Sequence, residues 1–190
     1  MVKAVIFDCF GVLVGTGFND TYYHAGGDPH KDKQFINDLL NKANLGLISE
    51  AGFKEAISRK IGITTGVYDK AVSEAERLNR DLLNYILKLR PKYKTAVLSN
   101  ANLGVLERYL GEDLLDRSFD ERIVSAEVGV LKPDPEIYNL TAQKLGVKNE
   151  ECVFIDDTPH YVQAARAVGM QAIVYKDFVQ MKTDLEKLLS

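Results

Sequence analysis

Several residue types are scarce in this chain of 190 residues, and each scarcity excludes a class of protein. There is no tryptophan, and the only cysteines are Cys9 and Cys152. Two cysteines exclude a disulfide-stapled secreted domain. Both lie inside short apolar runs, so we expect buried thiols in a reducing, cytoplasmic setting. No apolar run approaches the ~18 residues of a membrane-spanning helix, and the start, Met1–Asp8, is typical of a strand rather than of a signal peptide.

The chain also lacks an excess of charge of either sign. It carries 24 Lys and Arg against 27 Asp and Glu, a formal net charge of −3. This balance gives no electrostatic footprint for nucleic acid or an anionic membrane, so neither is expected as a partner. Apolar residues make up 46% and charged residues 27%, which is typical of a globular protein. The length predicts one domain, with room for a small insertion.

Five short apolar runs predict the strands of the fold. Continuous apolar runs, unlike alternating ones, are typical of parallel strands that are covered on both faces. Helical patterns separate these runs, which predicts an α/β fold: a Rossmann-like open parallel sheet with helices on both faces. The predicted strands are Ala4–Phe7, Thr95–Leu98, Arg122–Val124, Cys152–Ile155 and Ala172–Tyr175.

Proline and glycine mark the ends of two of the helices between these runs. Asp134 can cap a helix that begins at Pro135, and Gly146 can end it. A second helix is predicted between Thr158-Pro159 and Gly169. Proline in the first turn and glycine after the last one are the usual boundary residues of a helix.

One long stretch departs from the alternation of strands and helices. No strand is predicted between Val14 and Pro91, and residues 14–31, with Gly15, Gly17, Gly26 and Gly27, are predicted as a loop. Helices are expected over 32–44, 49–61 and 68–89, because apolar residues recur there at helical spacing. We therefore expect a helical cap with a glycine-rich connecting loop over residues 14–91, inserted into a core of residues 1–13 and 92–190.

Polar residues occur where the predicted strands end. In an open α/β sheet, ligands bind at the carboxyl ends of the strands, so these residues are expected at one edge. Clustered carboxylates repel one another unless a cation intervenes, and oxygen ligands suit Mg²⁺. The alternative is that the acids cap the neighbouring helices. The strand-end residues are Asp8, Ser99, Asn100, Asp156 and Asp157, and the loop after the third strand carries Lys132.

Four ordered motifs surround these residues, and together they resemble those of the haloacid dehalogenase-like hydrolase superfamily. The resemblance extends from Lys3 to about Tyr175. It implies a helical cap between the first and second motifs, as in small sugar-phosphate phosphatases and the N-terminal phosphatase domain of soluble epoxide hydrolases. The motifs are Phe7–Leu13, Val97–Asn100, Gly129–Tyr138 and Phe154–Met170.

The resemblance also implies roles for individual residues. Asp8 would be the nucleophile and a metal ligand, and Ser99, with Asn100 beside it, would bind the transferring phosphoryl group. Lys132 would orient Asp8 and neutralise charge. Asp157 would hold Mg²⁺, with Asp156 binding it directly or through water, and the backbone carbonyl of Phe10 would be a further ligand. The implied substrate is a small phosphorylated metabolite.

Phe10 departs from the pattern of the family's phosphatases. They usually carry a second Asp two residues after the nucleophile, which protonates the leaving alcohol and then activates water. A phenyl ring can do neither, and general acid–base catalysis typically contributes 10²–10⁴-fold. Tyr161 is a lesser departure, because many relatives have Asn at that position.

Three hypotheses follow for the function. The first is a Mg²⁺-dependent phosphatase with a relocated or missing general acid, for which the candidates are Asp20, Tyr22, His24, His30 and His160. The second is a 2-haloacid dehalogenase, since a halide leaves without a proton; however, that chemistry needs no metal, and this chain has no Arg before Arg59 with which to grip a substrate carboxylate. The third is a non-catalytic module that binds Mg²⁺ or phosphate.

Overall fold

The core of the fold is a sheet of parallel strands. The structure is a computed structural model, and it describes residues 1–15, 18–75 and 77–190. Its strands form one sheet with the order β3-β2-β1-β4-β5, in which every pair is parallel. All five predicted strands are confirmed, and so is the α/β class. The strands are β1 (Ala4–Phe7), β2 (Lys94–Ser99), β3 (Glu121–Val124), β4 (Cys152–Asp156) and β5 (Gln171–Val174).

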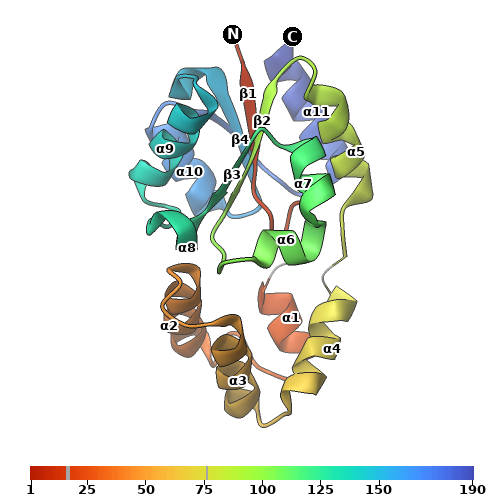
Figure 1. The fold of residues 1–190 in the computed structure, drawn as a ribbon, viewed down its shortest axis with the longest axis vertical. Helices are drawn as coiled ribbons and strands as arrows, with labels where there is room; N and C mark the ends of the chain where they lie inside the picture. Colours follow the sequence, from red (N-terminus) through yellow and green to blue (C-terminus); the bar gives the residue numbers. More distant parts are fainter. Residues whose placement is uncertain (16–17, 76) are drawn as a thin grey trace.

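Helices cover both faces of the sheet because the strands are apolar on both faces. In β1, Ala4 and Ile6 belong to one buried cluster and Val5 and Phe7 to another, as the two-residue period of a strand requires. The first cluster includes residues of α9 and α10, and the second includes residues of α5, α6, α7 and α11. Figure 1 shows α9 and α10 on one side of the sheet and α5 and α11 on the other. These helices are α5 (Arg80–Leu89), α6 (Val105–Leu110), α7 (Glu112–Ser118), α9 (Pro135–Leu145), α10 (Pro159–Ala167) and α11 (Phe178–Leu189).

The predicted boundaries of α9 and α10 are confirmed. The Asp134 side chain accepts a hydrogen bond from Glu136 N at 2.9 Å, and α9 ends at Leu145, directly before Gly146, whose φ is 68°. α10 begins at Pro159 and ends shortly before Gly169. Two short helices lie in the connections, α8 (Ser125–Val128) and the 3-10 helix η1 (Asn149–Glu151). No helix in the described part of the chain is long and apolar enough to cross a membrane.

The stretch after β1 folds into four helices that stand apart from the sheet (Figure 1). They have their own buried cluster, which includes Tyr22, Ile57 and Tyr68. The helical insertion after β1 is thus confirmed. Its helices are α1 (Phe18–His24), α2 (Lys33–Asn44), α3 (Glu50–Ile61) and α4 (Thr65–Ala75).

The prediction of a loop over residues 14–31 is wrong in part, because α1 lies within it. This short helix forms because its apolar side chains find partners in the insertion. Tyr22 is fully buried, and the Phe18 ring lies 5.8 Å from the rings of both Tyr22 and Phe53. Gly17, one of the glycines that suggested a loop, lies outside the described residues.

The prediction of one helix over 68–89 is also wrong, because the chain forms two helices there. Leu78 lies between them and pairs with Val14 in an antiparallel bridge. Asn79 then caps α5 by accepting a hydrogen bond from Leu82 N at 3.2 Å. Ala71 belongs to the cluster of the insertion, whereas Leu82 belongs to the core cluster on the sheet.

The division into a cap of residues 14–91 and a core of 1–13 and 92–190 stays a prediction. The packing of α5 with the sheet favours a second boundary near Leu78 rather than at residue 91. The insertion also touches the core directly. The Ser125 hydroxyl donates to Asn44 O at 2.6 Å, and Asn102 Nδ2 donates to Ile48 O at 2.9 Å.

Candidate active site

A buried lysine lies between two carboxylates at the carboxyl edge of the sheet. Lys132 Nζ is 2.8 Å from Asp8 Oδ1 and 2.6 Å from Asp156 Oδ2. The exposed fractions of Asp8, Lys132 and Asp156 are 7%, 2% and 0%. Charged residues this deeply buried are rare unless they are paired. The pairing of the lysine with both carboxylates is what allows all three side chains to be buried here.

The sheet topology brings the acids together. β1 and β4 are neighbouring parallel strands, so Asp8 after β1 and Asp156 at the end of β4 reach the same edge. Asp8 N donates to Ile155 O at 2.8 Å, which extends the pairing of β1 with β4 to Asp8. Asp8, Asp156 and Asp157 each offer a carboxylate oxygen, and these oxygens all lie within 4.8 Å of one another.

Burial and charge shift the pKa values of these groups. Burial, helped by the Asp156 charge, raises the pKa of Asp8 to about 8, although Lys132 opposes the shift. Burial lowers the pKa of Lys132, but the two carboxylates raise it by more, so its ammonium stays charged. Burial and the neighbouring Asp156 raise the pKa of Asp157. The site therefore holds more carboxylate than its one lysine neutralises.

The donor set fits a hard divalent cation. Three carboxylates at this spacing offer only oxygen ligands, which Mg²⁺ prefers. Asp156 Oδ1 also accepts a hydrogen bond from Thr158 N at 2.8 Å in the turn before α10, while Oδ2 binds Lys132. Thr158, which sequence reasoning missed, also donates from its hydroxyl to Asp157 Oδ1 at 3.3 Å.

Two residues at the end of β2 lie beside the loop that carries Lys132. Asn100 binds the backbone of Lys132 at two points: Oδ1 accepts from Lys132 N at 2.8 Å, and Nδ2 donates to Lys132 O at 2.9 Å. The buried hydroxyl of Ser99 has no hydrogen-bond partner among the described residues. Burying an unpaired hydroxyl costs free energy, so Ser99 is a candidate to bind a ligand oxygen.

Tyr161 occupies the rim of the lysine site. Its ring centroid is 5.0 Å from Lys132 Nζ, and its hydroxyl accepts a hydrogen bond from Asn100 Nδ2 at 3.4 Å. Burial raises the pKa of its phenol. The aromatic ring thus gives the lysine a cation–π contact.

Phe10 lies next to the acids but belongs to the core cluster on the sheet. Its ring is half-buried and meets the Tyr109 ring edge-on at 5.5 Å, and the Arg108 guanidinium lies 4.5 Å from the Tyr109 ring. Arg108 also forms an ion pair with Glu50 of the cap helix α3. Phe10 offers no proton at this position. Its backbone carbonyl as a metal ligand stays a prediction.

The candidates for a relocated acid are scattered over the cap and the rim. Tyr22 is committed to the cap interior, because its buried hydroxyl donates to Asp32 Oδ2 at 2.8 Å. His24 lines a cavity beside the cap linkers, together with Arg77. His160 is exposed, and its ring lies 4.2 Å from the Tyr161 ring.

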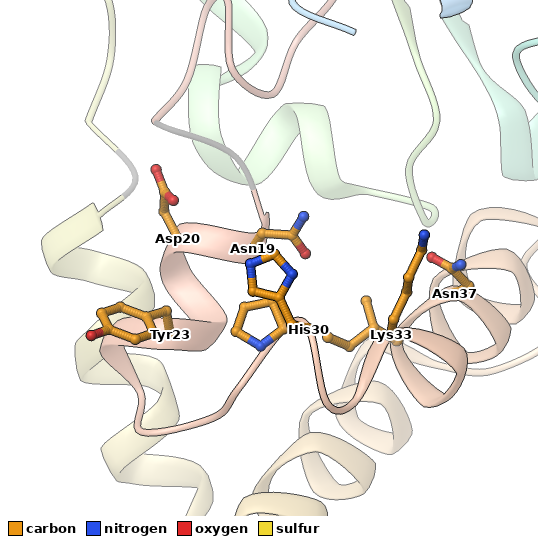
Figure 2. A pocket seen from close by; sticks show the side chains of 8 residues that line it. Asn19, Asp20, Tyr23, His30, Lys33 and Asn37 are labelled. Carbon is orange, nitrogen blue, oxygen red and sulfur yellow. The ribbon is translucent and has the colours of Figure 1, made fainter.

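The remaining candidates, Asp20 and His30, line a cavity of about 470 Å³ between α1 and the start of α2. Figure 2 shows Asp20 and Lys33 extending from these two helices toward the green core segments drawn above them. The cavity is lined by Asn19, Asp20, Tyr23, Pro29, His30, Lys33, Ile36 and Asn37.

The fold is a parallel α/β sheet with a helical insertion. At the carboxyl ends of its strands lies a cluster of acids with a buried lysine, which is typical of a metal-binding site. The chain belongs to the haloacid dehalogenase-like hydrolase family, whose model matches residues 2–169. This confirms the family resemblance found in the four motifs.

Similar proteins cover nearly the whole chain. It is 28% identical to the pig (Sus scrofa) bifunctional epoxide hydrolase 2 over 98% of this chain, but it spans only 39% of that protein. It is 28% identical to a phosphorylated carbohydrates phosphatase of Thermotoga maritima, covering 90% of this chain and 84% of the relative. A structure of a haloacid dehalogenase family enzyme from Bacteroides thetaiotaomicron, in complex with magnesium and inorganic phosphate, is 23% identical, with a TM-score of 0.72 over 95% of this chain and 99% of the other.

Proposed function

We propose that this chain is a Mg²⁺-dependent phosphatase that acts on a small phosphorylated metabolite through an aspartyl-phosphate on Asp8. The observation that carries the proposal is the buried ammonium of Lys132 between Asp8 and Asp156, in a cluster that contains a third carboxylate. A structural ion pair would need neither the third acid nor, at the end of β2, a buried Ser99 hydroxyl that has no partner in the described part of the chain. The Thermotoga phosphatase and the magnesium and phosphate in the Bacteroides structure support the same reading.

Asp8, Asp156 and Asp157 would hold the metal, together with the carbonyl of Phe10. When bound, Mg²⁺ would keep the carboxylates ionised and neutralise charge on the phosphoryl oxygens. The raised pKa of Asp8 makes this important, because only the ionised carboxylate is a nucleophile.

The reaction proceeds in two displacements at phosphorus. Cys9 N and Lys132 Nζ both bind Asp8 Oδ1, at 2.7 and 2.8 Å, so we assign the attack to Oδ2. Oδ2 forms a bond to phosphorus as the bond from phosphorus to the leaving oxygen breaks. Water then attacks the phosphorus, releases inorganic phosphate and regenerates the carboxylate.

The remaining residues hold the phosphoryl group. Ser99 donates its hydroxyl to a phosphoryl oxygen, which gives this buried group the partner it lacks among the described residues. Lys132 offsets the negative charge that accumulates around Asp8. Asn100 positions Lys132 by binding its backbone at both the N–H and the carbonyl.

The leaving group determines how much the missing acid matters. An alkoxide needs a proton as it leaves, and Phe10 cannot supply one. An acyl phosphate or p-nitrophenyl phosphate releases a weakly basic anion, so we expect turnover to be fastest with these substrates.

A panel of substrates separates the three hypotheses. Acetyl phosphate, p-nitrophenyl phosphate and 2-chloropropionate are each incubated with the wild type, with Mg²⁺ or with EDTA. Phosphate release that requires Mg²⁺ is the expected result. Chloride release from 2-chloropropionate in EDTA would instead favour a dehalogenase. No turnover of any substrate, with Mg²⁺ binding detected by calorimetry, would favour a binding module.

A further inference from the structure

Asn79 lies where the chain returns from the cap to the core, and both ends of its side-chain amide are hydrogen-bonded. Nδ2 donates to Val12 O at 3.0 Å and to the Tyr175 hydroxyl at 2.7 Å, while Oδ1 accepts from Leu82 N at 3.2 Å. Its backbone N donates to Leu13 O at 2.8 Å. Capping α5 uses only one of these four bonds, so helix capping alone does not account for the residue.

Two of the bonds hold the loop that follows Asp8. This loop is a tight turn in which Cys9 O accepts from Leu13 N at 2.7 Å and from Val14 N at 2.9 Å. The internal bonds fix the shape of the turn, but they do not fix where it lies relative to the rest of the sheet. Asn79 does this from outside, by binding two successive carbonyls of the turn, those of Val12 and Leu13.

The hydrogen bond from Asn79 Nδ2 to the Tyr175 hydroxyl connects Asn79 to the strand end that carries Asp156. Tyr175 directly follows β5, and its backbone N donates to Asp156 O at 2.9 Å. Asn79 therefore joins the Asp8 loop to the Asp156 strand end through one amide and one phenol. The cap linkers meet at the same point, because Val14 pairs with Leu78 and Gly15 N donates to Arg77 O at 2.9 Å.

We propose that Asn79 is a positioning residue that sets the spacing of Asp8 from Asp156 and Asp157, and with it the affinity of the site for Mg²⁺. Its kinetic consequence rests on the proposed phosphatase function, but its effect on metal binding does not. Residues that orient metal ligands without touching the metal typically change affinity or activity by 10–100-fold when mutated.

Three variants separate positioning from helix capping. Asn79→Asp keeps the oxygen that caps α5 but removes both amide donors. Tyr175→Phe removes the hydroxyl partner and leaves the cap and the Val12 bond in place. The matched control is Ser49→Ala, which removes a side-chain cap that accepts from Gly52 N at 3.1 Å at the start of α3, remote from the Asp8 loop.

The test is calorimetry of Mg²⁺ binding, with thermal unfolding and p-nitrophenyl phosphate kinetics on the same variants. Because Asn79→Asp loses two part-buried hydrogen bonds and sets a carboxylate against Val12 O, we expect it to lower the unfolding midpoint, as Ser49→Ala does, and also to weaken Mg²⁺ binding by roughly tenfold. Tyr175→Phe should weaken Mg²⁺ binding by about threefold. In the kinetics, kcat at a fixed Mg²⁺ concentration falls and KM changes little. Ser49→Ala lowers the unfolding midpoint and leaves Mg²⁺ affinity unchanged.

Wild-type Mg²⁺ affinity in Asn79→Asp, or a loss of affinity in Ser49→Ala as large as that in the Asn79 variant, would overturn the inference. So would a wild type that binds no Mg²⁺. A wild type that binds Mg²⁺ but releases no phosphate would defeat the proposed phosphatase, while the calorimetric comparison would still decide the role of Asn79.

Discussion

Gly11 faces Asp157 so closely that a β-carbon at Gly11 would overlap the Asp157 carboxylate. The φ of Gly11 is 81°, in the left-handed region that side chains rarely adopt. Both the backbone conformation and the contact therefore require glycine here. The backbone of the Asp8 loop thus packs directly against the acid that follows β4.

Gly11→Ala is expected to displace Asp157 and weaken Mg²⁺ binding by about tenfold or more. The control is Gly169→Ala, because Gly169 has a φ of 93° and a β-carbon there would extend into open space. Both variants carry a backbone strain of about 1–2 kcal/mol, but only the first moves an acid. Calorimetry and thermal unfolding measure the two effects. Equal Mg²⁺ affinity in the two variants would contradict the role of Asp157.

Ser99→Ala is expected to weaken phosphate binding without destabilising the fold. The buried hydroxyl has no partner among the described residues, so its removal costs little free energy of unfolding. A hydrogen bond to a charged group contributes about 1.5 kcal/mol or more, which is roughly tenfold in affinity. The measurement is the inhibition constant of inorganic phosphate.

Ser118→Ala is the matched control for Ser99→Ala. Ser118 is likewise buried with no partner for its hydroxyl in the part of the chain that the structure describes, and it lies at the end of α7, before β3 begins. Its loss should leave phosphate inhibition unchanged. An equal change in the inhibition constant in both variants would show that Ser99 acts through packing and not by contact with phosphate.

Phe10→Asp is expected to increase the turnover of alkyl phosphates, since it supplies the missing proton donor. General acid–base catalysis contributes about 10²–10⁴-fold, and loss of the Phe10–Tyr109 ring contact offsets part of this gain. Phe10→Asn has almost the same shape as Phe10→Asp and cannot give a proton, so it should show no gain. The comparison is kcat/KM for an alkyl phosphate and for p-nitrophenyl phosphate, with the larger gain expected for the alkyl ester.

Asp32 makes the cap sensitive to acid. Its pKa is lowered by hydrogen bonds from Lys60 and from Tyr22, with Lys60 Nζ at 3.0 Å and the Tyr22 hydroxyl at 2.8 Å. Because the folded pKa lies below the usual value of about 3.8, the unfolded chain takes up the proton first. The stabilisation is present above pH ~4 and is lost as the pH falls through the folded pKa.

We expect Asp32→Asn to lower the unfolding midpoint at neutral pH and to flatten its decline in acid. Asp38→Asn is the control, because Asp38 is an exposed residue of α2 that accepts only a bond from Gln34 at 3.0 Å among the contacts described. Unfolding midpoints are compared between about pH 6 and pH 3. Parallel curves for the wild type and Asp32→Asn would contradict this assignment.

The strands could be predicted because buried parallel strands are continuous apolar runs, and each predicted run agrees with its observed strand within one or two residues. α1 could not be predicted, because the glycines around it signal a loop and the helix depends on the burial of Tyr22. The break between α4 and α5 at Asn79 could not be predicted from the sequence either. Apolar residues continue at helical spacing from Ala71 to Leu89 although the two halves pack on different clusters.

The strand-end rule placed the polar residues of the site at one edge, and the structure brings Asp8, Lys132, Asp156 and Asp157 together there. Their catalytic roles stay predictions. The supporting contacts could not be predicted, because they join positions far apart in the sequence. Asn79 signals only a helix cap, and nothing in the sequence indicates that its amide reaches Tyr175.

The most direct test of the account is the release of phosphate from acetyl phosphate by the wild type and by Asp8→Asn, each with Mg²⁺ and with EDTA. Asn keeps the shape of the side chain but is a far poorer nucleophile. We predict turnover by the wild type that EDTA abolishes and that falls by about 10³-fold or more in a folded Asp8→Asn variant. Equal rates of phosphate release by the two proteins, or a wild-type rate that EDTA leaves unchanged, would contradict the account.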